Sequence, residues 1–272
     1  MTTRVKHATV AVLATLLSTW GIVASASVPT TCDGHAVTIS GTDNADVING
    51  TSGRDIIHGG GGDDIIKGKG GNDVICGGGG GDEIKGGEGN DVIRGGSHTD
   101  YLYGNGDNDT IYGNGGDDYI DGGWGDDEIW GGDGDDVLWG DLDRDNLHGE
   151  DGHDDLYGRD GQDKLWGGDD NDLLCGGDDH DILKGQADND TLCGGGADDE
   201  LYGQRGNDVL DGGECFQDDE VSDVLDGGQE TDTCYWGDDS SGRNDATIDC
   251  EGEIQVAEHD ASNLCALLSR PW

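Results

Sequence analysis

The stretch GGGGDDIIK, from Gly59 to Lys67, decides the fold because the chain repeats its plan many times. The later stretch GGEGNDVIR, from Gly86 to Arg94, follows the same plan, and nineteen such units run without insertion from Gly41 to Asp211. Every unit has Gly at its first position, Asp at its sixth and Ile or Leu at its eighth. A fixed short period predicts a stacked architecture in which each unit contacts its neighbours.

Within one unit, the composition separates a turn from a strand. The first six residues are rich in Gly, Asp and Asn, which are typical of turns. The last three are enriched in Val, Ile, Leu, Tyr and Trp, which predicts a three-residue strand with the eighth residue pointing inward. Two units would form one coil, so that each unit stacks on the next but one and alternate units build two parallel sheets. We therefore expect an all-β, right-handed parallel β-roll.

This array resembles the hemolysin-type calcium-binding repeats, the RTX nonapeptides, whose pattern is G-G-x-G-x-D-x-U-x. The match covers Gly41 to Asp211 and, after a six-residue insertion, resumes at Ser222 to Asp226 and Gly227 to Tyr235. The resemblance implies that calcium lies between stacked turns, bound by the sixth-position carboxylates and by backbone carbonyls of the Gly-rich loops.

The spacing of the acidic residues predicts a similar site. Sixth-position aspartates that are eighteen residues apart would lie about 5 Å apart on successive coils, where unpaired carboxylates repel strongly. Divalent ions between the coils would remove this repulsion, and nineteen stacked turns offer about seventeen such gaps. The predicted calcium ligands are Asp46, Asp55, Asp64, Asp73, Asp82, Asp91, Asp100, Asp109, Asp118, Asp127, Asp136, Asp145, Asp154, Asp163, Asp172, Asp181, Asp190, Asp199 and Asp208.

The fourth position departs from Gly in eight units. A residue with a side chain at a turn position of positive φ is costly unless it is Asn or Asp. We therefore expect the turns with His98 and Ala197 to bind calcium most weakly. The eight residues are Asn44, His98, Asp107, Asp143, Asp170, Asp179, Asp188 and Ala197.

The charge of the chain excludes some partners. The formal net charge is −47, which argues against nucleic acid and against anionic membrane surfaces. Low hydrophobicity together with high net charge also indicates a chain that does not fold unaided. The expected cofactor is therefore a set of calcium ions that both fold and neutralise the array.

The N-terminus has the pattern of a secretory signal peptide. A basic stretch precedes the apolar run Ala8 to Leu17, and Ala24-Ser25-Ala26 fits a cleavage site, so the exported chain would begin near Ser27. No later segment resembles a transmembrane span. We expect a signal peptide at 1–26, an N-terminal cap at 27–40, the repeat array at 41–235 with its insertion within 212–226, and a C-terminal cap at 236–272.

Eight cysteines in an exported chain suggest disulfides rather than metal thiolates, and no CxxC pair is present. Cys175 and Cys193 occupy the same position one coil apart, which predicts a disulfide between them. Cys32 would reach Cys76 through the N-terminal cap. Three pairings remain open for Cys215, Cys250, Cys234 and Cys265.

Three classes of function fit the sequence. We favour a secreted, non-enzymatic calcium-binding module, because the chain has no HExxH or GxSxG motif. The second class is a calcium-dependent adhesin that binds a cell-surface glycan or protein through outward aromatic residues at the ninth position. These aromatic residues could equally serve cross-strand packing. The third, an enzyme such as a lyase or epimerase built on a parallel roll, has no catalytic constellation to support it.

Overall fold

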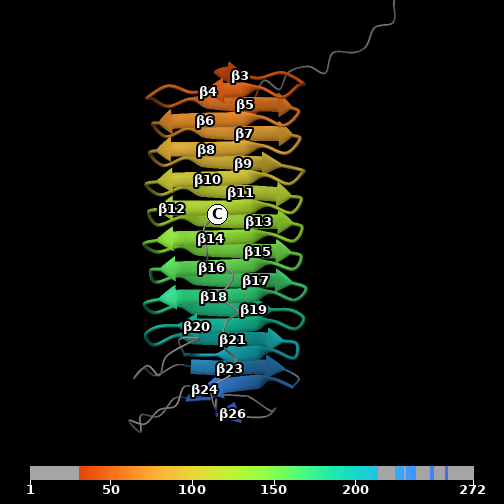
Figure 1. Cartoon of the computed structure of the whole chain (residues 1–272), viewed down its shortest axis with the longest axis vertical. Helices are drawn as coiled ribbons and strands as arrows, with labels where there is room; N and C mark the ends of the chain where they lie inside the picture. The colour runs from red at the N-terminus through yellow and green to blue at the C-terminus, as the bar shows by residue number, and fades with distance from the viewer. Residues whose placement is uncertain (1–30, 214–223, 230, 237–245, 248–254, 257–272) are drawn as a thin grey trace, which may run out of the picture.

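The computed structural model of the chain describes residues 31–213, 224–229, 231–236, 246–247 and 255–256. The predicted signal peptide and most of the predicted C-terminal cap lie outside these residues. Every regular element in the described part is a strand, and Figure 1 shows them stacked like rungs along one axis. In this part of the chain there is no helix long and apolar enough to span a membrane.

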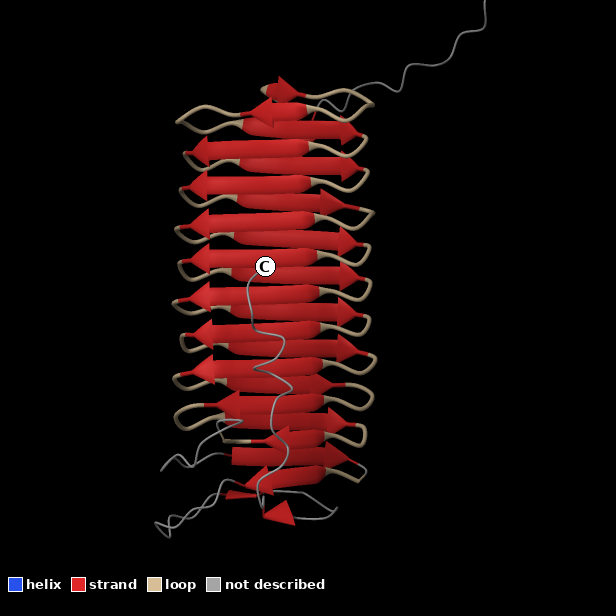
Figure 2. Ribbon diagram, in the orientation of Figure 1, coloured by secondary structure: helices blue, strands red, loops and turns tan. Residues whose placement is uncertain are grey.

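Two parallel sheets of twelve strands form the roll, and alternate strands belong to alternate sheets (Figure 2). The first sheet contains β4 (Val47–Asn49), β6 (Ile65–Gly70), β8 (Glu83–Glu88), β10 (Tyr101–Gly106), β12 (Tyr119–Trp124), β14 (Val137–Leu142), β16 (Asp155–Asp160), β18 (Leu173–Asp178), β20 (Thr191–Gly195), β22 (Val209–Asp211), β24 (Thr233–Trp236) and β26 (Gln255–Val256). The second contains β3 (Ile39–Ser40), β5 (Ile56–Gly61), β7 (Val74–Gly79), β9 (Val92–Gly96), β11 (Thr110–Gly115), β13 (Glu128–Asp133), β15 (Asn146–Asp151), β17 (Lys164–Asp169), β19 (Ile182–Gln186), β21 (Glu200–Arg205), β23 (Val224–Gln229) and β25 (Ala246–Thr247).

The register between strands is eighteen residues, as the repeat predicts. Leu102 of β10 pairs with Ile84 of β8 and with Ile120 of β12, so each unit stacks on the next but one. The parallel β-roll predicted from the sequence is confirmed. After β21 the register widens to twenty-four residues, with Leu201 opposite Leu225, which accommodates the six-residue insertion.

The strands are longer than the three residues that the sequence predicts. A typical strand such as β6 has six residues, because the first three residues of the next unit continue the strand. Lys69 and Gly70 of β6 therefore pair with Gly87 and Glu88 of β8 and do not form the turn. The turn itself is reduced to about the fourth, fifth and sixth residues of each unit, which concentrates its chemistry on the aspartate.

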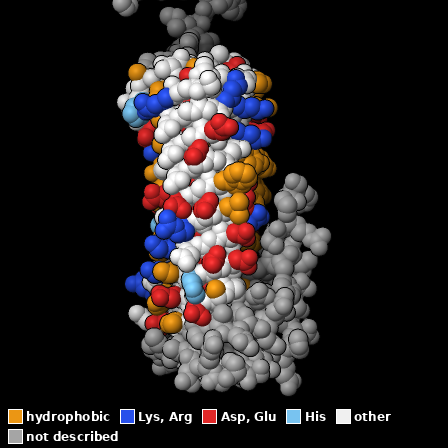
Figure 3. Space-filling model, turned by 90° about the vertical axis from the view of Figure 1, so that its left-hand side faces the viewer, with side chains coloured by type: hydrophobic (Ala, Val, Ile, Leu, Met, Phe, Trp, Pro, Cys, Tyr) orange, Lys and Arg blue, Asp and Glu red, His pale blue; other side chains and the backbone are white. Residues whose placement is uncertain are grey.

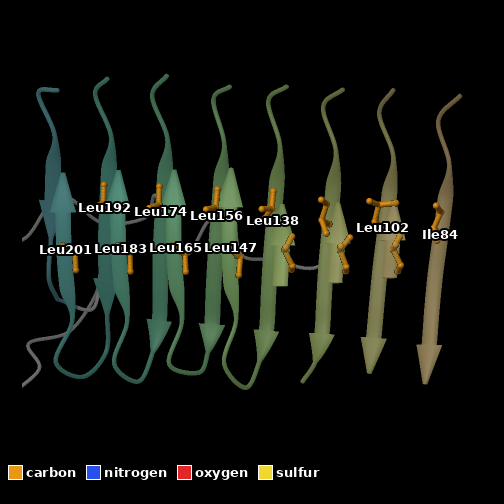
Figure 4. Packing of buried hydrophobic residues seen from close by; sticks show 14 of the residues in the cluster. Ile84, Leu102, Leu138, Leu147, Leu156, Leu165, Leu174, Leu183, Leu192 and Leu201 are labelled. Atoms are coloured by element: carbon orange, nitrogen blue, oxygen red, sulfur yellow. The ribbon is translucent and has the colours of Figure 1, made fainter. Parts of the chain in front are cut away.

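The core is a double column of aliphatic side chains. The eighth residue of every unit points inward, and from Ile57 to Leu210 these side chains have 0% exposure. Figure 4 shows Leu147, Leu165 and Leu183 in one row and Leu138, Leu156 and Leu174 in a second row beside it, and the two rows belong to the two sheets and to one buried cluster. The core is thus one residue thick on each side, and each rung contributes one side chain to it.

The N-terminal residues cover the outer face of the second sheet. The short hairpin of β1 (Thr31–Cys32) and β2 (His35–Ala36) places Cys32 against Ile56 and Val74, and all three side chains are buried. A disulfide joins Cys32 to Cys76, as predicted. An ion pair between Asp33 and Arg94, with 2.8 Å between Oδ1 and a guanidinium nitrogen, also ties the hairpin to the sheet.

The predicted disulfide between Cys175 and Cys193 is wrong. The two residues face each other in the register of β18 and β20, and both are disulfide-bonded, but Cys32–Cys76 is the disulfide that joins two described residues. In-register residues on parallel strands hold their Cβ atoms at about the strand spacing of 4.8 Å, whereas a disulfide needs about 3.8 Å. The prediction considered the Cα separation and neglected the parallel side-chain directions.

Candidate metal centre

The sixth-position aspartates lie inside the roll, at the turns on its two edges. Each one directly precedes a strand, as Asp64 precedes β6, so the turn carries its side chain inward beside the aliphatic core. From Asp64 to Asp208 their exposed fractions are at most 4%, although carboxylates are almost never fully buried unless paired. Asp55 is 7% exposed and Asp46 is partly exposed.

These aspartates form two files, one along each edge. From Asp64 to Asp208, one oxygen of each carboxylate, Oδ1, accepts a hydrogen bond from the backbone N–H of the aspartate eighteen residues earlier. The distance is 2.7 Å from Asp46 N to Asp64 Oδ1 and 2.8 Å from Asp64 N to Asp82 Oδ1. The same bond links Asp55 to Asp73 and continues to Asp199 in the other file. The structure thus brings all nineteen predicted residues into the expected stacks.

The second oxygen, Oδ2, is left without a donor over most of both files. From Asp64 to Asp190, every sixth-position Oδ2 is buried and accepts no hydrogen bond. A buried polar atom without a partner costs about 1–3 kcal/mol, and a charged one costs more. These repeated buried oxygens without donors are the feature of the site that most clearly requires a positive charge.

The invariant first-position Gly is explained by the same oxygen. A Cβ atom added to Gly59 would lie 2.3 Å from Asp64 Oδ2 and 2.5 Å from the carbonyl oxygen of Gly77. Equivalent contacts recur at Gly113, with Asp118 and Gly131. Only Gly leaves room for a carboxylate oxygen and a carbonyl oxygen from the next rung to converge at this point.

Burial also raises the pKa values of these carboxyl groups. It raises the pKa of Asp109, Asp136 and Asp145 to about 8, and that of Asp172 and Asp181 to about 9. The backbone hydrogen bond to Oδ1 lowers each value, but desolvation is larger, and the negative charges of neighbouring aspartates add to it. In the absence of a cation, the folded state therefore favours protons on groups that are ionised in the unfolded chain at neutral pH.

The turn backbone supplies the other half of the site. The second and fourth residues of most units adopt a positive φ, for example Gly60 at 118° and Gly62 at 90°. No group of three or more His, Cys, Asp or Glu side chains in the described residues could hold a metal ion alone. A cation here would need backbone carbonyls as well as the Asp Oδ2 atoms, and all-oxygen ligands of this kind suit calcium.

The residues that replace Gly at the fourth position of a unit differ in their backbone conformation. Asp107, Asp143, Asp170, Asp179 and Asp188 have φ values between 68° and 78°, so the usual turn is kept. Ala197 is forced into the same conformation, with φ of 77°, and its turn carries the strain. His98 avoids a positive φ, and its Nδ1 accepts a hydrogen bond of 3.4 Å from Gly80 N.

The predicted ligands omit Asp232, which the structure places in the first file. Its exposed fraction is 0%, and its Oδ1 accepts a hydrogen bond of 3.0 Å from Asp208 N. Asp232 is the sixth residue of the unit GGQETDTCY, so the repeat itself points to it. The repeat resumes at this unit after the insertion, but the predicted ligands are limited to the nineteen uninterrupted units that end at Asp211.

Comparison with protein families agrees with this geometry. The sequence profile of the RTX calcium-binding nonapeptide repeat matches the chain over residues 40–75 and, in overlapping copies, over 77–214. The chain belongs to the RTX calcium-binding repeat family. No curated protein matches the chain closely enough to add a relative. The RTX match extends over nearly all of the two aspartate files, so the residues with the buried, donor-free Oδ2 atoms are those of the family's repeat.

The residues fit the calcium that the RTX family implies. The ion would be held by Oδ2 of the sixth-position aspartates and by carbonyl oxygens of the neighbouring turns, and it would supply the charge that these buried carboxylates lack. Asp Oδ1 remains bound to the backbone of the preceding rung and so fixes the direction of Oδ2. Figure 3 shows the outer surface of one edge of this RTX roll, where a band of backbone and other uncharged atoms carries scattered acidic residues and is flanked by basic and hydrophobic side chains.

Proposed function

We propose that this RTX repeat protein is a secreted structural module that folds when it binds many calcium ions outside the cell. The observation that carries the proposal is the series of buried Oδ2 atoms without donors, from Asp64 to Asp190. Each of these atoms makes the fold unfavourable until a cation is present. A chain with a net charge of −47 would therefore stay unfolded where calcium is scarce and condense where it is abundant.

A calcium titration of the oxidised chain, followed by far-UV circular dichroism and calorimetry, tests the proposal. We expect little sheet content in EDTA, a cooperative gain of sheet as calcium is added, and release of heat. Magnesium is the control, because its strict octahedral geometry and firmly held waters do not suit carbonyl-rich turns. Full sheet content in EDTA, or an equal response to magnesium, would refute the proposal.

Multiple occupancy is part of the proposal. Ions in the gaps between successive rungs would number up to about seventeen for nineteen stacked turns. At ten times the Kd, each independent site would stabilise the fold by about 1.4 kcal/mol. Native mass spectrometry at saturating calcium counts the ions directly, and a stoichiometry of one or two would contradict this part of the proposal.

Export through an N-terminal signal peptide belongs to the same proposal, since residues 1–26 have the required pattern. The chain would then meet calcium and oxidising conditions together, which suits the Cys32–Cys76 disulfide. Sequencing the N-terminus of the exported protein should give Ser27. Retention of Met1 would show that the segment is not removed.

A calcium-dependent adhesin is the second candidate function. The ninth-position rings of Tyr112, Trp130, His148 and Trp166 do not favour it, because each is stacked on the next with centroids 4.3–5.4 Å apart, which covers the ring faces. A different group on the first sheet does favour it. Trp124 is 70% exposed and pairs in register with Leu142, which is 38% exposed.

A glycan array with and without chelator separates the two functions, with Trp124→Ala as the variant and Trp130→Ala as its control. Calcium-dependent binding that is lost in Trp124→Ala alone would support the adhesin. The absence of calcium-dependent binding would leave the structural module, which we also propose to be non-enzymatic.

A further inference from the structure

The first two turns of the array differ from those that follow, except for the turn of Gly96 and His98, which also lacks a positive φ at both positions. Their second residues are Thr42 and Thr51, and neither has a positive φ, whereas the second residues Gly60, Lys69 and Gly78 have φ values of 118°, 87° and 116°. The fourth residues of these two turns, Asn44 and Gly53, also lie outside the positive-φ region that Gly62 and Gly71 occupy. The chain therefore begins with two turns of another kind.

In these two turns the Oδ2 atoms of the aspartates already accept hydrogen bonds from the protein. Asp46 Oδ2 accepts hydrogen bonds from Thr42 N at 2.7 Å and from Thr42 Oγ1 at 2.8 Å. Asp55 Oδ2 accepts the same pair from Thr51, at 2.7 Å and 2.9 Å. The donor-free Oδ2 atoms begin only at Asp64.

The side chain of Thr explains the change of turn. A β-branched residue is strongly disfavoured at positive φ, so the peptide before Thr takes the opposite orientation from that before Gly. The Thr N–H then points at Oδ2, together with the hydroxyl group. Two hydrogen-bond donors occupy the place where a cation would need an oxygen ligand.

Two further contacts hold these turns. The hydroxyl oxygens accept hydrogen bonds from within their own turns, from Asn44 N at 3.3 Å to Thr42 Oγ1 and from Gly53 N at 3.2 Å to Thr51 Oγ1. On the next rung, the ammonium group of Lys69 donates a hydrogen bond of 2.7 Å to the carbonyl oxygen of Gly50. A side-chain cation thus binds a turn carbonyl next to Thr51.

We propose that Thr42, Thr51 and Lys69 exclude calcium from the first two turns and let them fold before any ion binds. The inference rests on the proposed function, because it divides the array into a calcium-free start and a calcium-dependent remainder. The disulfide of Cys32 to Cys76 closes over this start, since it attaches the N-terminal hairpin to β7. We call the folded residues 31–76 the seed. Calcium binding to the later turns would then extend the roll from this seed.

Hydrogen exchange of the oxidised full-length chain in EDTA tests the seed. We expect amides of β5, such as Ile57, to exchange at least tenfold more slowly than their counterparts in β11, such as Ile111. The double variant Thr42→Gly/Thr51→Gly should lose this protection in EDTA and regain it in calcium. Equal exchange of the two strands in the wild-type chain would overturn the proposal.

The disulfide needs its own control, because it could protect β5 and β7 without help from the threonines. In the variant Cys32→Ser/Cys76→Ser, the contrast between β5 and β11 should shrink but remain. If it vanishes there while Thr42→Gly/Thr51→Gly keeps it, the protection comes from the disulfide and the proposal is wrong.

Ion counting by native mass spectrometry tests the exclusion itself. The wild-type chain should bind about two ions fewer than the seventeen gaps allow, and Thr42→Gly/Thr51→Gly should gain up to two. The matched control uses an ordinary turn, at Asn105, which is the second residue of its unit and has a φ of 82°. Asn105→Thr should lose one ion and Asn105→Gly none. An unchanged count in all these variants would overturn the exclusion.

These results separate the inference from the proposed function. If β11 and the later strands fail to gain protection in calcium, the proposed function fails, whatever the first turns do. If they do gain protection while the threonine variants behave like the wild type, the proposed function stands and this inference fails.

Discussion

The aliphatic columns and the aspartate files are both buried, both repeat every nine residues, and have opposite consequences for stability. From Ile57 to Leu210, the Ile and Leu side chains at the eighth position have 0% exposure. Their apolar contacts need no other group once the two sheets have packed together. The sixth-position aspartates are at most 4% exposed from Asp64 to Asp208, yet through Asp190 each of them keeps one oxygen without a donor. The aliphatic side chains therefore determine the shape of the roll, while the aspartates make that shape conditional on a cation.

Truncation of a core residue should have the largest effect. Leu156→Ala removes a fully buried side chain from a core that is one residue thick, so it should cost about 3–5 kcal/mol in the calcium-bound state. Chemical denaturation at saturating calcium measures the loss. Val137→Ala, at a partly exposed outward position on β14, is the control and should cost about 1 kcal/mol or less. Equal losses in the two variants would contradict the assignment of the core.

Neutralisation of a file residue should have an effect whose sign depends on calcium. Asp136→Asn keeps an oxygen that can accept the N–H of Asp118 and removes the charge at Oδ2. In calcium it should destabilise the fold by about 1–3 kcal/mol, and in EDTA it should be neutral or stabilising. Asp135→Asn, at the exposed neighbouring position, should change stability by less than about 0.5 kcal/mol in either condition.

The same sign in calcium and in EDTA would show that Asp136 is a structural residue only. Denaturation curves for both variants, recorded in both conditions, give the four values that the comparison needs.

Acid should stabilise the calcium-free fold. The pKa values of Asp109, Asp145 and Asp190 are raised to about 8 in the folded state, from an ordinary value of 3.8. Between these limits the folded state binds more protons than the unfolded state, so its stability increases as the pH falls from about 9 to 4. Sheet content in EDTA, measured across this range, should rise on acidification.

With calcium present the dependence reverses, because protons and calcium compete for the same oxygens. Calcium affinity should therefore fall as the pH falls from 8 to 5, whereas the cost of Leu156→Ala should not change. A calcium affinity that is independent of pH would show that the buried carboxylates do not bind the ion.

The period predicted the roll, the inward eighth residue and the stacking of the aspartates, because these follow from a repeat of fixed length. It did not predict that the strands extend through the first three residues of the next unit, since Gly68 and Gly70 have no intrinsic preference for a strand. Nor did it predict the bond from Oδ1 to the backbone of the neighbouring rung, which depends on the turn geometry. Thr42 and Thr51 look like ordinary variation at the second position until the direction of their N–H groups is known.

The stacked rings on the outer face of the second sheet should make the smallest contribution. Arg94 lies 4.1 Å from the centroid of Tyr112, and the column continues through Trp130, His148 and Trp166. Aromatic pairs of this kind are worth about 0.5–1.5 kcal/mol, so Trp130→Leu should cost about 1 kcal/mol in calcium without changing the number of bound ions.

The control is Trp124→Leu on the first sheet, whose ring is 70% exposed and has no ring contact among the described aromatic pairs. It should cost less than about 0.5 kcal/mol, because little buried area is lost. If Trp130→Leu also reduced the calcium count, the outer face and the edge files would be coupled. Calcium binding would then depend on the stacked rings of the outer face as well as on the aspartates at the edges.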